Sequence, residues 1–90
     1  MYPTDHGLVS LGSYDAGELY AWEETEVWYD PTRKEFWVYE GGGCSCNGPY
    51  DYYQGKADLN GPYPSLAIAL RDTPQRLKEL VTKNWEVVNR

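Results

Sequence analysis

The stretch ELYAWEETEVWYDPTRKEFWVYE, residues 18–40, decides the fold. It is rich in Tyr, Trp, Val and Thr, the aromatic and β-branched residues that suit the pleated surface of a sheet. The segment Asp30-Pro31-Thr32-Arg33 in its middle is a turn signal, because Asp30 can bond back to the backbone and Pro31 presets φ for the second turn position. The stretch therefore predicts a β-hairpin with strands over residues 18–29 and 35–40.

Both faces of this predicted hairpin carry large side chains. Successive residues of a strand point to opposite faces. One face collects Leu19, Ala21, Val27, Tyr29, Phe36 and Val38. The other collects Tyr20, Trp22, Trp28, Trp37 and Tyr39 among the carboxylates Glu18, Glu24, Glu26 and Asp30. A small antiparallel sheet needs only one apolar face, so the second face either lies under a loop or helix or binds a partner.

The segments on either side complete an α+β fold. The apolar segment 7–13 predicts a third strand, since two strands alone are marginally stable. Thr73 as N-cap and Pro74 in the first turn predict a C-terminal helix. Its apolar stripe has helical spacing and consists of Leu77, Leu80, Val81, Trp85 and Val88. Ser65 is a second candidate N-cap, for a shorter helix over 65–72 that could also be read as a strand.

We therefore expect one domain, residues 1–90, since this length leaves no room for a second core. The expected architecture is a three-stranded antiparallel β-meander over residues 7–40, with the C-terminal helix packed on one face. Residues 41–64 are expected to form a long Gly- and Tyr-rich loop, and residues 65–88 the helical part. A loop of that length is unusual in a compact domain, so it is either functional or contains structure that the pattern does not reveal.

The charge distribution favours a basic protein partner. The net charge is −6, and residues 1–53 hold ten acidic residues against Arg33 and Lys34, whereas residues 54–90 hold four acidic residues against six basic ones. An acidic half repels phosphates, so direct nucleic-acid binding is not expected. A protein with a basic patch, or self-association of opposite ends into a homo-oligomer, fits this distribution.

Several absences indicate a cytoplasmic protein. No apolar run is long enough to span a membrane, and residues 1–15 lack the basic start and apolar core of a secretory signal. The chain has only two cysteines, Cys44 and Cys46, and they are two residues apart, so no disulfide framework is expected to be possible within the chain. A reducing compartment is therefore expected.

The chemistry-bearing residues do not predict an enzyme or a cofactor. Cys44 and Cys46 could supply two zinc ligands, with His6 or a carboxylate completing the site, but the C-x-C spacing is shorter than usual and one chain has too few thiolates. Nothing assembles a nucleophile, a base and an oxyanion donor. A thiol–zinc module remains an alternative function, and no bound metal is expected.

A second alternative function is mimicry of nucleic acid. Glu24 and Glu26, with Glu18 and Asp30 further along, fall on one strand face, where residues two apart are separated by about 6.6 Å. Successive phosphates of a DNA strand have a comparable spacing, so a basic host protein could recognise the row. The simpler interpretation is a solvated strand face whose acidic residues deter edge-to-edge pairing.

The preferred interpretation is a non-enzymatic protein-interaction module. Tyr and Trp anchor interfaces because they bring contact area with little rotamer entropy. We expect contacts from the outer hairpin face and the Tyr50–Tyr53 region, with Glu24 and Glu26 steering the partner. The expected contact residues are Trp22, Glu24, Glu26, Trp28, Trp37, Tyr39, Tyr52 and Tyr53.

The hairpin with its Asp-Pro turn, followed by the loop Gly-Gly-Gly-Cys-Ser-Cys-Asn-Gly-Pro at 41–49, resembles small uncharacterised proteins of actinobacterial phages and their hosts. Those proteins combine an acidic aromatic hairpin, a G-C-S-C loop and a short C-terminal helix. The resemblance covers about residues 14–85. It implies a phage or prophage accessory protein, and it carries over no activity and no site residues.

Overall fold

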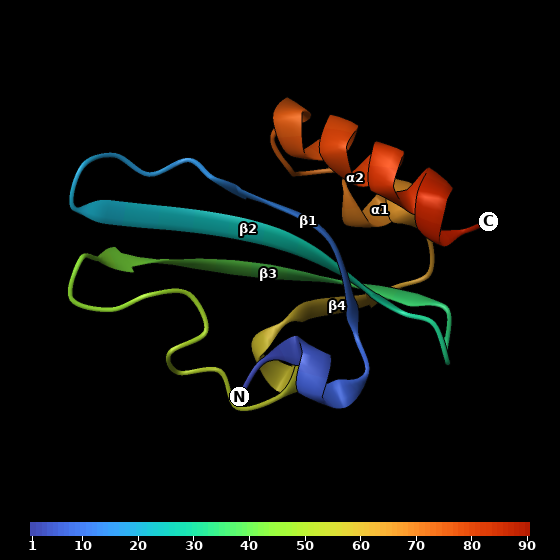
Figure 1. Cartoon of the computed structure of the whole chain (residues 1–90), viewed down its shortest axis with the longest axis horizontal. Helices are drawn as coiled ribbons and strands as arrows, with labels where there is room; N and C mark the ends of the chain where they lie inside the picture. The colour runs from blue at the N-terminus through green and yellow to red at the C-terminus, as the bar shows by residue number, and fades with distance from the viewer.

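The computed structural model describes all 90 residues. They form a four-stranded antiparallel sheet with two α-helices on one face (Figure 1). The strands follow one another along the sheet in the order β1-β2-β3-β4. Their bounds are β1 Val9–Asp15, β2 Ala21–Asp30, β3 Glu35–Cys44 and β4 Asn60–Tyr63. The predicted α+β class and antiparallel meander are confirmed, but the sheet has one more strand than expected.

The helical elements lie on opposite sides of this sheet (Figure 1). The short helix α1, Leu66–Ala69, and the long helix α2, Gln75–Val88, cover one face. The opposite face is covered by the 3₁₀ turn η1, Pro3–His6, and by the segment 45–59, which contains a second 3₁₀ turn, η2, Lys56–Asp58. Figure 1 shows that α1, α2 and η1 lie away from the end of the β2–β3 hairpin at which the β1–β2 loop stands, whereas the segment after β3 begins at that end and runs back beneath the hairpin.

The first core fills the space between the sheet and the helices. Leu11, Val27, Leu77 and Val81 are fully enclosed there, and Tyr14, Tyr29, Tyr63, Leu66 and Trp85 pack around the core. The Trp85 ring meets both Tyr29 and Phe36 edge to face, at 4.8 and 5.1 Å between ring centroids. The Asn84 side-chain amide fixes α2 to β1 by donating to the Leu11 carbonyl at 2.7 Å. Gly12 has a φ of +144°, and a Cβ there would lie 3.0 Å from the Leu80 side chain, so glycine permits the close approach.

A second core occupies the opposite face of the sheet. It consists of Leu8, Trp28, Trp37, Tyr50, Tyr53 and Leu59, with Tyr39 packed against it. The segment 45–59 supplies three of these residues and therefore functions as a cover for the sheet. Of the two alternatives for the outer hairpin face, cover by a loop is the one that the structure shows over this part of the hairpin.

The hairpin turn forms as its sequence predicts. Asp30 Oδ1 accepts hydrogen bonds from the backbone N–H groups of Thr32 and Arg33, at 3.0 and 3.2 Å. Asp30 is itself buried, and Lys56 Nζ lies 3.2 Å from its other oxygen. The Asp30 carboxylate therefore links the hairpin turn between β2 and β3 to the η2 segment.

The region 41–64 differs most from expectation. Gly41–Cys44 continue β3, pairing with Ala21–Glu24 of β2, and Asn60–Tyr63 form the edge strand β4. The interpretation of the whole region as a loop is therefore wrong at both ends. Glycine and proline mask these strands in the sequence, because both residues are rare inside strands.

The two predicted helix starts have different outcomes. Ser65 is the N-cap of α1, and its hydroxyl accepts from the Ile68 N–H, as expected. Thr73 is not the N-cap of α2. Pro74 takes that position, and the Thr73 hydroxyl instead donates to the Leu70 carbonyl at 2.8 Å. The expected apolar stripe holds at Leu77 and Val81, which are buried.

Candidate functional site

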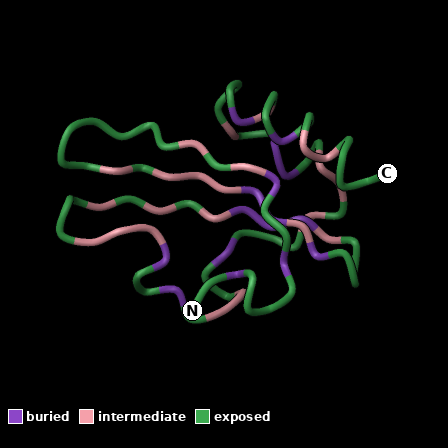
Figure 2. The backbone as a smooth tube through the Cα atoms, in the orientation of Figure 1, coloured by how far each residue is buried: buried purple, intermediate pink, exposed green.

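The two ends of the β2–β3 hairpin differ in cover. We call residues 27–30 and 35–38 the proximal end, and residues 21–24 and 41–44, with the β1–β2 loop 16–20, the distal end. Figure 2 shows buried residues gathered at the proximal end, whereas the distal end is exposed or intermediate throughout. The distal end is thus the part of the sheet whose two faces remain available.

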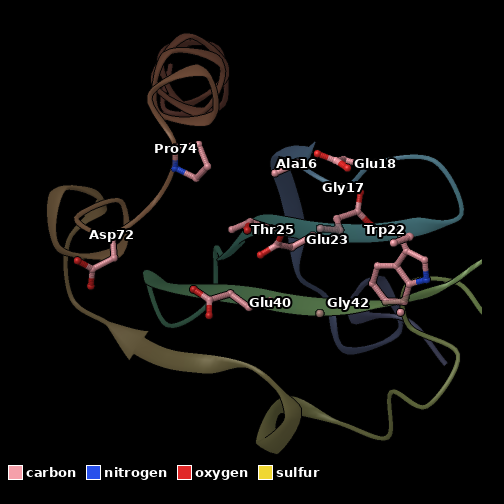
Figure 3. A pocket seen from close by; sticks show the side chains of 14 residues that line it. Ala16, Gly17, Glu18, Trp22, Glu23, Thr25, Glu40, Gly42, Asp72 and Pro74 are labelled. Carbon is pink, nitrogen blue, oxygen red and sulfur yellow. The ribbon is translucent and has the colours of Figure 1, made fainter.

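On the helix side of the distal end lies a groove of about 920 Å³, which we call the acidic groove (Figure 3). Its floor is formed by β2 and β3, with Gly41 and Gly42 exposing backbone, and its walls come from the β1–β2 loop and from the chain before α2. No Lys, Arg or His lines it. Five acidic residues line it, Glu18, Glu23, Glu24, Glu40 and Asp72. Because side chains alternate along β2, the Glu24 carboxylate is on the face of Trp28, opposite the helices, so the other four supply the charge on the helix side.

The electrostatics of this end favour a cationic ligand. Burial raises the pKa of Glu24, and the nearby carboxylates of Glu26 and Asp15 raise it further. Asp15 is held differently. Its Oδ1 accepts from the N–H groups of Glu23 and Gly17, at 2.9 and 2.8 Å, and these bonds lower its pKa. Glu24 therefore has unfavourable like-charge neighbours that a positive partner would relieve.

A second depression, the aromatic pocket, lies on the opposite side of the sheet and has a volume of about 220 Å³. It opens between the β3 segment 39–42 and the segment 47–58. Five rings line it, those of Trp22, Tyr39, Tyr50, Tyr52 and Tyr53, together with the carboxyl residues Asp51 and Asp58 and the amide of Asn47. Tyr39 and Tyr50 stack with their ring centroids 4.0 Å apart, and Tyr53 meets Tyr50 edge to face at 5.8 Å.

A hydrogen-bonded chain fixes the wall of this pocket. Trp28 Nε1 donates to the Tyr50 hydroxyl at 2.9 Å, and that hydroxyl donates to Glu26 Oε1 at 2.6 Å. The Ser10 hydroxyl donates to Glu26 Oε2, also at 2.6 Å. Burial and the Glu26 carboxylate raise the pKa of Tyr50, so its hydroxyl stays protonated as a donor.

Trp22 connects the pocket to the loop that covers it. Its Nε1 donates to the Asn47 carbonyl at 2.9 Å. A Cβ at Gly43 would lie 2.9 Å from that same Nε1, so the neighbouring strand needs glycine at this position. The glycine run 41–43, which the sequence suggested was a loop, therefore makes space for the Trp22 ring on a strand.

The expected contact residues separate into two groups. Trp28, Trp37 and Tyr53 are 5%, 9% and 6% exposed and belong to the second core. Trp28 and Trp37 form no contact surface in this fold, which corrects the expectation for these two rings, and Tyr53 contributes only to the lining of the aromatic pocket. The cause is the cover provided by segment 45–59. Tyr52 is 80% exposed, whereas Trp22, Tyr39, Glu24 and Glu26 are intermediate. Four of the expected residues, Trp22, Tyr39, Tyr52 and Tyr53, line the aromatic pocket.

The predicted carboxylate row is not a free row. Glu26 is engaged by Tyr50 and Ser10, and Asp30 is buried in the hairpin turn. Glu18 lies in the β1–β2 loop, before β2 begins. Regular spacing along one strand placed these groups on a common face, but neighbouring segments use two of them internally.

The structure joins Cys44 and Cys46 by a disulfide, which corrects the expectation that no disulfide forms within the chain. His6 lies elsewhere, with its ring 5.8 Å from that of Tyr53. No group of three or more His, Cys, Asp or Glu side chains is arranged to hold a metal ion. The disulfide instead closes a small loop at the end of β3, where the Ser45 N–H donates to the Tyr20 carbonyl.

Sequence reasoning missed two exposed apolar residues at the distal end. Leu19 and Tyr20 are 87% and 80% exposed, because β2 begins only at Ala21 and both residues lie in the loop before it. Tyr20 has a positive φ of 67°, an uncommon conformation for a non-glycine residue. Asp15-Ala16-Gly17 contains residues that are common in turns, but nothing in this tripeptide indicates that the loop extends to Tyr20.

The fold and these two depressions define a small α+β domain with an open acidic end. The chain belongs to the family described as Domain of unknown function (DUF7574), which it matches over residues 1–87. No curated protein matches the chain. No solved structure matches it either. Neither α-helix has the length and apolar character needed to cross a bilayer.

Proposed function

We propose that this protein is a non-enzymatic interaction module that binds a protein with a basic patch through its distal end. The observation that carries the proposal is the acidic groove: the acidic side chains of Glu18, Glu23, Glu40 and Asp72 surround an open channel, and no basic side chain lines it. Like-signed charge around a concave surface steers an oppositely charged partner and suppresses wrong ones.

The exposed apolar residues beside the groove support the same proposal. Leu19 and Tyr20 lie in the β1–β2 loop that forms one wall of the groove, and both are exposed. Tyr52 is a further exposed ring, on the opposite side of the sheet. Single exposed apolar residues are common on protein surfaces. Here they accompany an uncovered sheet end, and aromatic anchors beside a charged surface are the usual composition of a binding site.

The phage role, the cytoplasmic location and the mimicry alternative rest on the sequence alone. A phage or prophage accessory role stays a prediction from the resemblance. The cytoplasmic location also stays a prediction, and the Cys44–Cys46 disulfide weakens one of its grounds because disulfides are rare in that compartment. The mimicry alternative is less favoured, since Glu26 and Asp30 are engaged internally.

The test is a comparative capture experiment. Wild-type protein and the double variant Glu23→Gln/Glu40→Gln are immobilised, exposed to bacterial lysate and read by mass spectrometry. Both glutamates are exposed, so the variant should fold. The control Glu79→Gln/Glu86→Gln removes the same charge from exposed positions of α2.

Proteins with basic patches should bind the wild type and the α2 control equally well. They should bind the groove variant at least tenfold more weakly, and binding to all three proteins should weaken as the salt concentration rises. Equal capture by all three proteins, or no specific capture, would contradict the proposal. The groove variant should retain the wild-type thermal unfolding midpoint within a few degrees, which shows that any loss reflects binding.

A further inference from the structure

We propose that the aromatic pocket binds the cationic head of a lysine or arginine side chain. This inference rests on the proposed function, because the partner's basic patch would supply that side chain. The pocket and the acidic groove share Trp22, Gly41 and Gly42 across the thickness of the sheet. A protein that approaches the distal end can therefore reach both.

The lining of the pocket has the composition that recognises organic cations. The face of an aromatic ring carries negative electrostatic potential, and a cation within about 6 Å of a ring centroid is attracted to it. Five rings converge on a volume of about 220 Å³. An apolar ligand would also meet these rings, so the rings alone do not decide the charge of the occupant.

The polar groups at the pocket decide the charge. Asp51 and Asp58 both line it, and no Lys, Arg or His does. The Asn47 Oδ1 atom is buried without a hydrogen-bond partner, and so is the hydroxyl of Tyr53, a residue that is only 6% exposed. Ammonium and guanidinium groups carry only donors, so they complement carboxylates and an unpaired amide oxygen.

The electrostatic environment of Tyr53 also favours a cationic occupant. Burial raises the pKa of its hydroxyl, and the carboxylates of Asp58 and Asp5 raise it further. The pocket region is therefore electrostatically negative. A bound cation would lower the cost of holding these carboxylates beside a partly desolvated ring cluster.

The second core already contains one contact of this kind. Lys56 Nζ lies 5.6 Å from the centroid of the Trp37 ring and 3.2 Å from Asp30 Oδ2. That pairing shows a cation held between a ring and a carboxylate in the same layer of the molecule. It also occupies Lys56, which does not line the pocket, so the chain's own lysine does not fill it.

The test uses small probes, so that no protein partner is needed. Uniformly ¹⁵N-labelled protein is titrated with N-acetyl-arginine methylamide and with N-acetyl-lysine methylamide at constant ionic strength. The neutral probe N-acetyl-norleucine methylamide serves as the apolar control. The readout is the indole N–H signal of Trp22, which reports on the pocket through its bond to the Asn47 carbonyl.

At least one cationic probe should give saturable shifts at Trp22 and in residues 47–53, with a dissociation constant in the millimolar range, and the neutral probe should bind at least fivefold more weakly. Asp51→Asn should weaken the cation at least threefold. An asparagine oxygen can still accept the 2.7 Å hydrogen bond from Gly48 N–H, so this variant removes charge and keeps the turn. Glu79→Gln, an equal charge change on α2, should leave binding unchanged.

Two results would overturn the inference. One is the absence of saturable shifts with either cation, and the other is equal binding of the neutral probe. The capture experiment separates this failure from failure of the proposed function. Basic proteins that still bind through the groove, without any probe binding, would leave the interaction module standing and remove the pocket from it. Probe binding without groove-dependent capture would keep the cation-binding pocket and contradict the proposed interaction module.

Discussion

The proximal and distal ends of one hairpin carry similar side chains but have different surroundings. At the proximal end, Trp28 pairs with Trp37 across the strands, and both rings are buried beneath Tyr50, Tyr53 and Leu59. At the distal end, Trp22 pairs with Gly43 and stays partly exposed. The composition of the strands does not separate these two ends. The segments that pack against them do.

This difference shows how one sheet serves both stability and recognition. The proximal end has a core on each face, and it supplies all the buried apolar residues of the hairpin, Val27, Trp28, Phe36, Trp37 and Val38. The distal end has carboxylates and glycines where the proximal end has apolar partners. Variants placed at matched positions of the two ends should therefore have unequal effects.

The largest effect is expected from truncating a tryptophan at each end. Trp28→Ala should lower the free energy of unfolding by about 3–5 kcal/mol, because it empties a core site and leaves the Tyr50 hydroxyl without its donor. Trp22→Ala should cost only about 1 kcal/mol, since the ring is half-exposed. Urea unfolding followed by circular dichroism measures both values.

Equal losses in the two variants would show that the distal end is as important for stability as the proximal end. The proposed division of the hairpin would then be wrong. A loss of stability in Trp22→Ala but not in Trp28→Ala would show that the distal end, and not the proximal end, stabilises the fold.

An intermediate effect is expected from Asp30 at the proximal end. Burial raises its pKa, but hydrogen bonds from Arg33 N–H, Lys56 and Thr32 N–H outweigh burial and hold the pKa below its ordinary value of 3.8. A depressed folded pKa stabilises the fold above the unfolded value, and this contribution is lost as the pH falls through the folded pKa. Asp30→Asn should therefore cost about 1–2 kcal/mol at pH 7, where the Lys56 pairing is lost.

The cost of Asp30→Asn should shrink as the wild-type carboxyl becomes protonated. Urea titrations at pH 7, 5 and 3 would show the two proteins converging in stability. A difference that is the same at every pH would mean that the carboxylate charge of Asp30 does not contribute.

The smallest effect, of opposite sign, is expected from Glu24 at the distal end. Burial and then repulsion by Glu26 and Asp15 raise its pKa above 4.5. An acid with a raised folded pKa destabilises the fold above that pKa, and the penalty disappears below the unfolded value. Glu24→Gln should raise stability at pH 7 by about 0.5 kcal/mol or less, and the gain should vanish below pH 4.5. A thermal shift series from pH 7 to 4 tests this, and a destabilised variant at pH 7 would contradict it.

The sequence predicted the parts of this fold whose signals are local. Asp30-Pro31 specified the hairpin turn, and alternation specified which face each strand residue occupies. Leu77 and Val81 marked the buried side of α2. These features depend on residues within a few positions of one another, so a single chain reveals them.

The parts that were missed depend on distant partners. The tetrapeptide Asn-Gly-Pro-Tyr occurs twice, at 47–50 and 60–63, and reads as a turn in both places. The first copy is a turn whose Tyr50 is buried on Trp28, whereas the second is the strand β4, paired with Phe36 and Val38 of β3. Identical residues acquire different structures because β3 is near enough to pair with only one of them.

The candidate site was predicted in the same uneven way. Trp22, Glu24 and Tyr52 were expected to lie at the surface from their composition, and they do so at least in part. Burial of Trp28 and Trp37 could not be predicted, because it depends on how segment 45–59 folds back over the sheet. The acidic groove could not be predicted either, since Asp72 and Glu18 are distant in sequence and line one groove only in the folded chain.

The register of β4 has a consequence for how copies of this protein meet one another. β4 pairs with β3 only at Phe36 and Val38, so the outer side of residues 39–44 has no neighbouring strand. Such a border could seed stacking of one molecule on the next. Glu40 lies on that border, and the surplus of negative charge makes identical molecules repel. Mild acid removes the repulsion while the hairpin persists, so these molecules should aggregate under that condition.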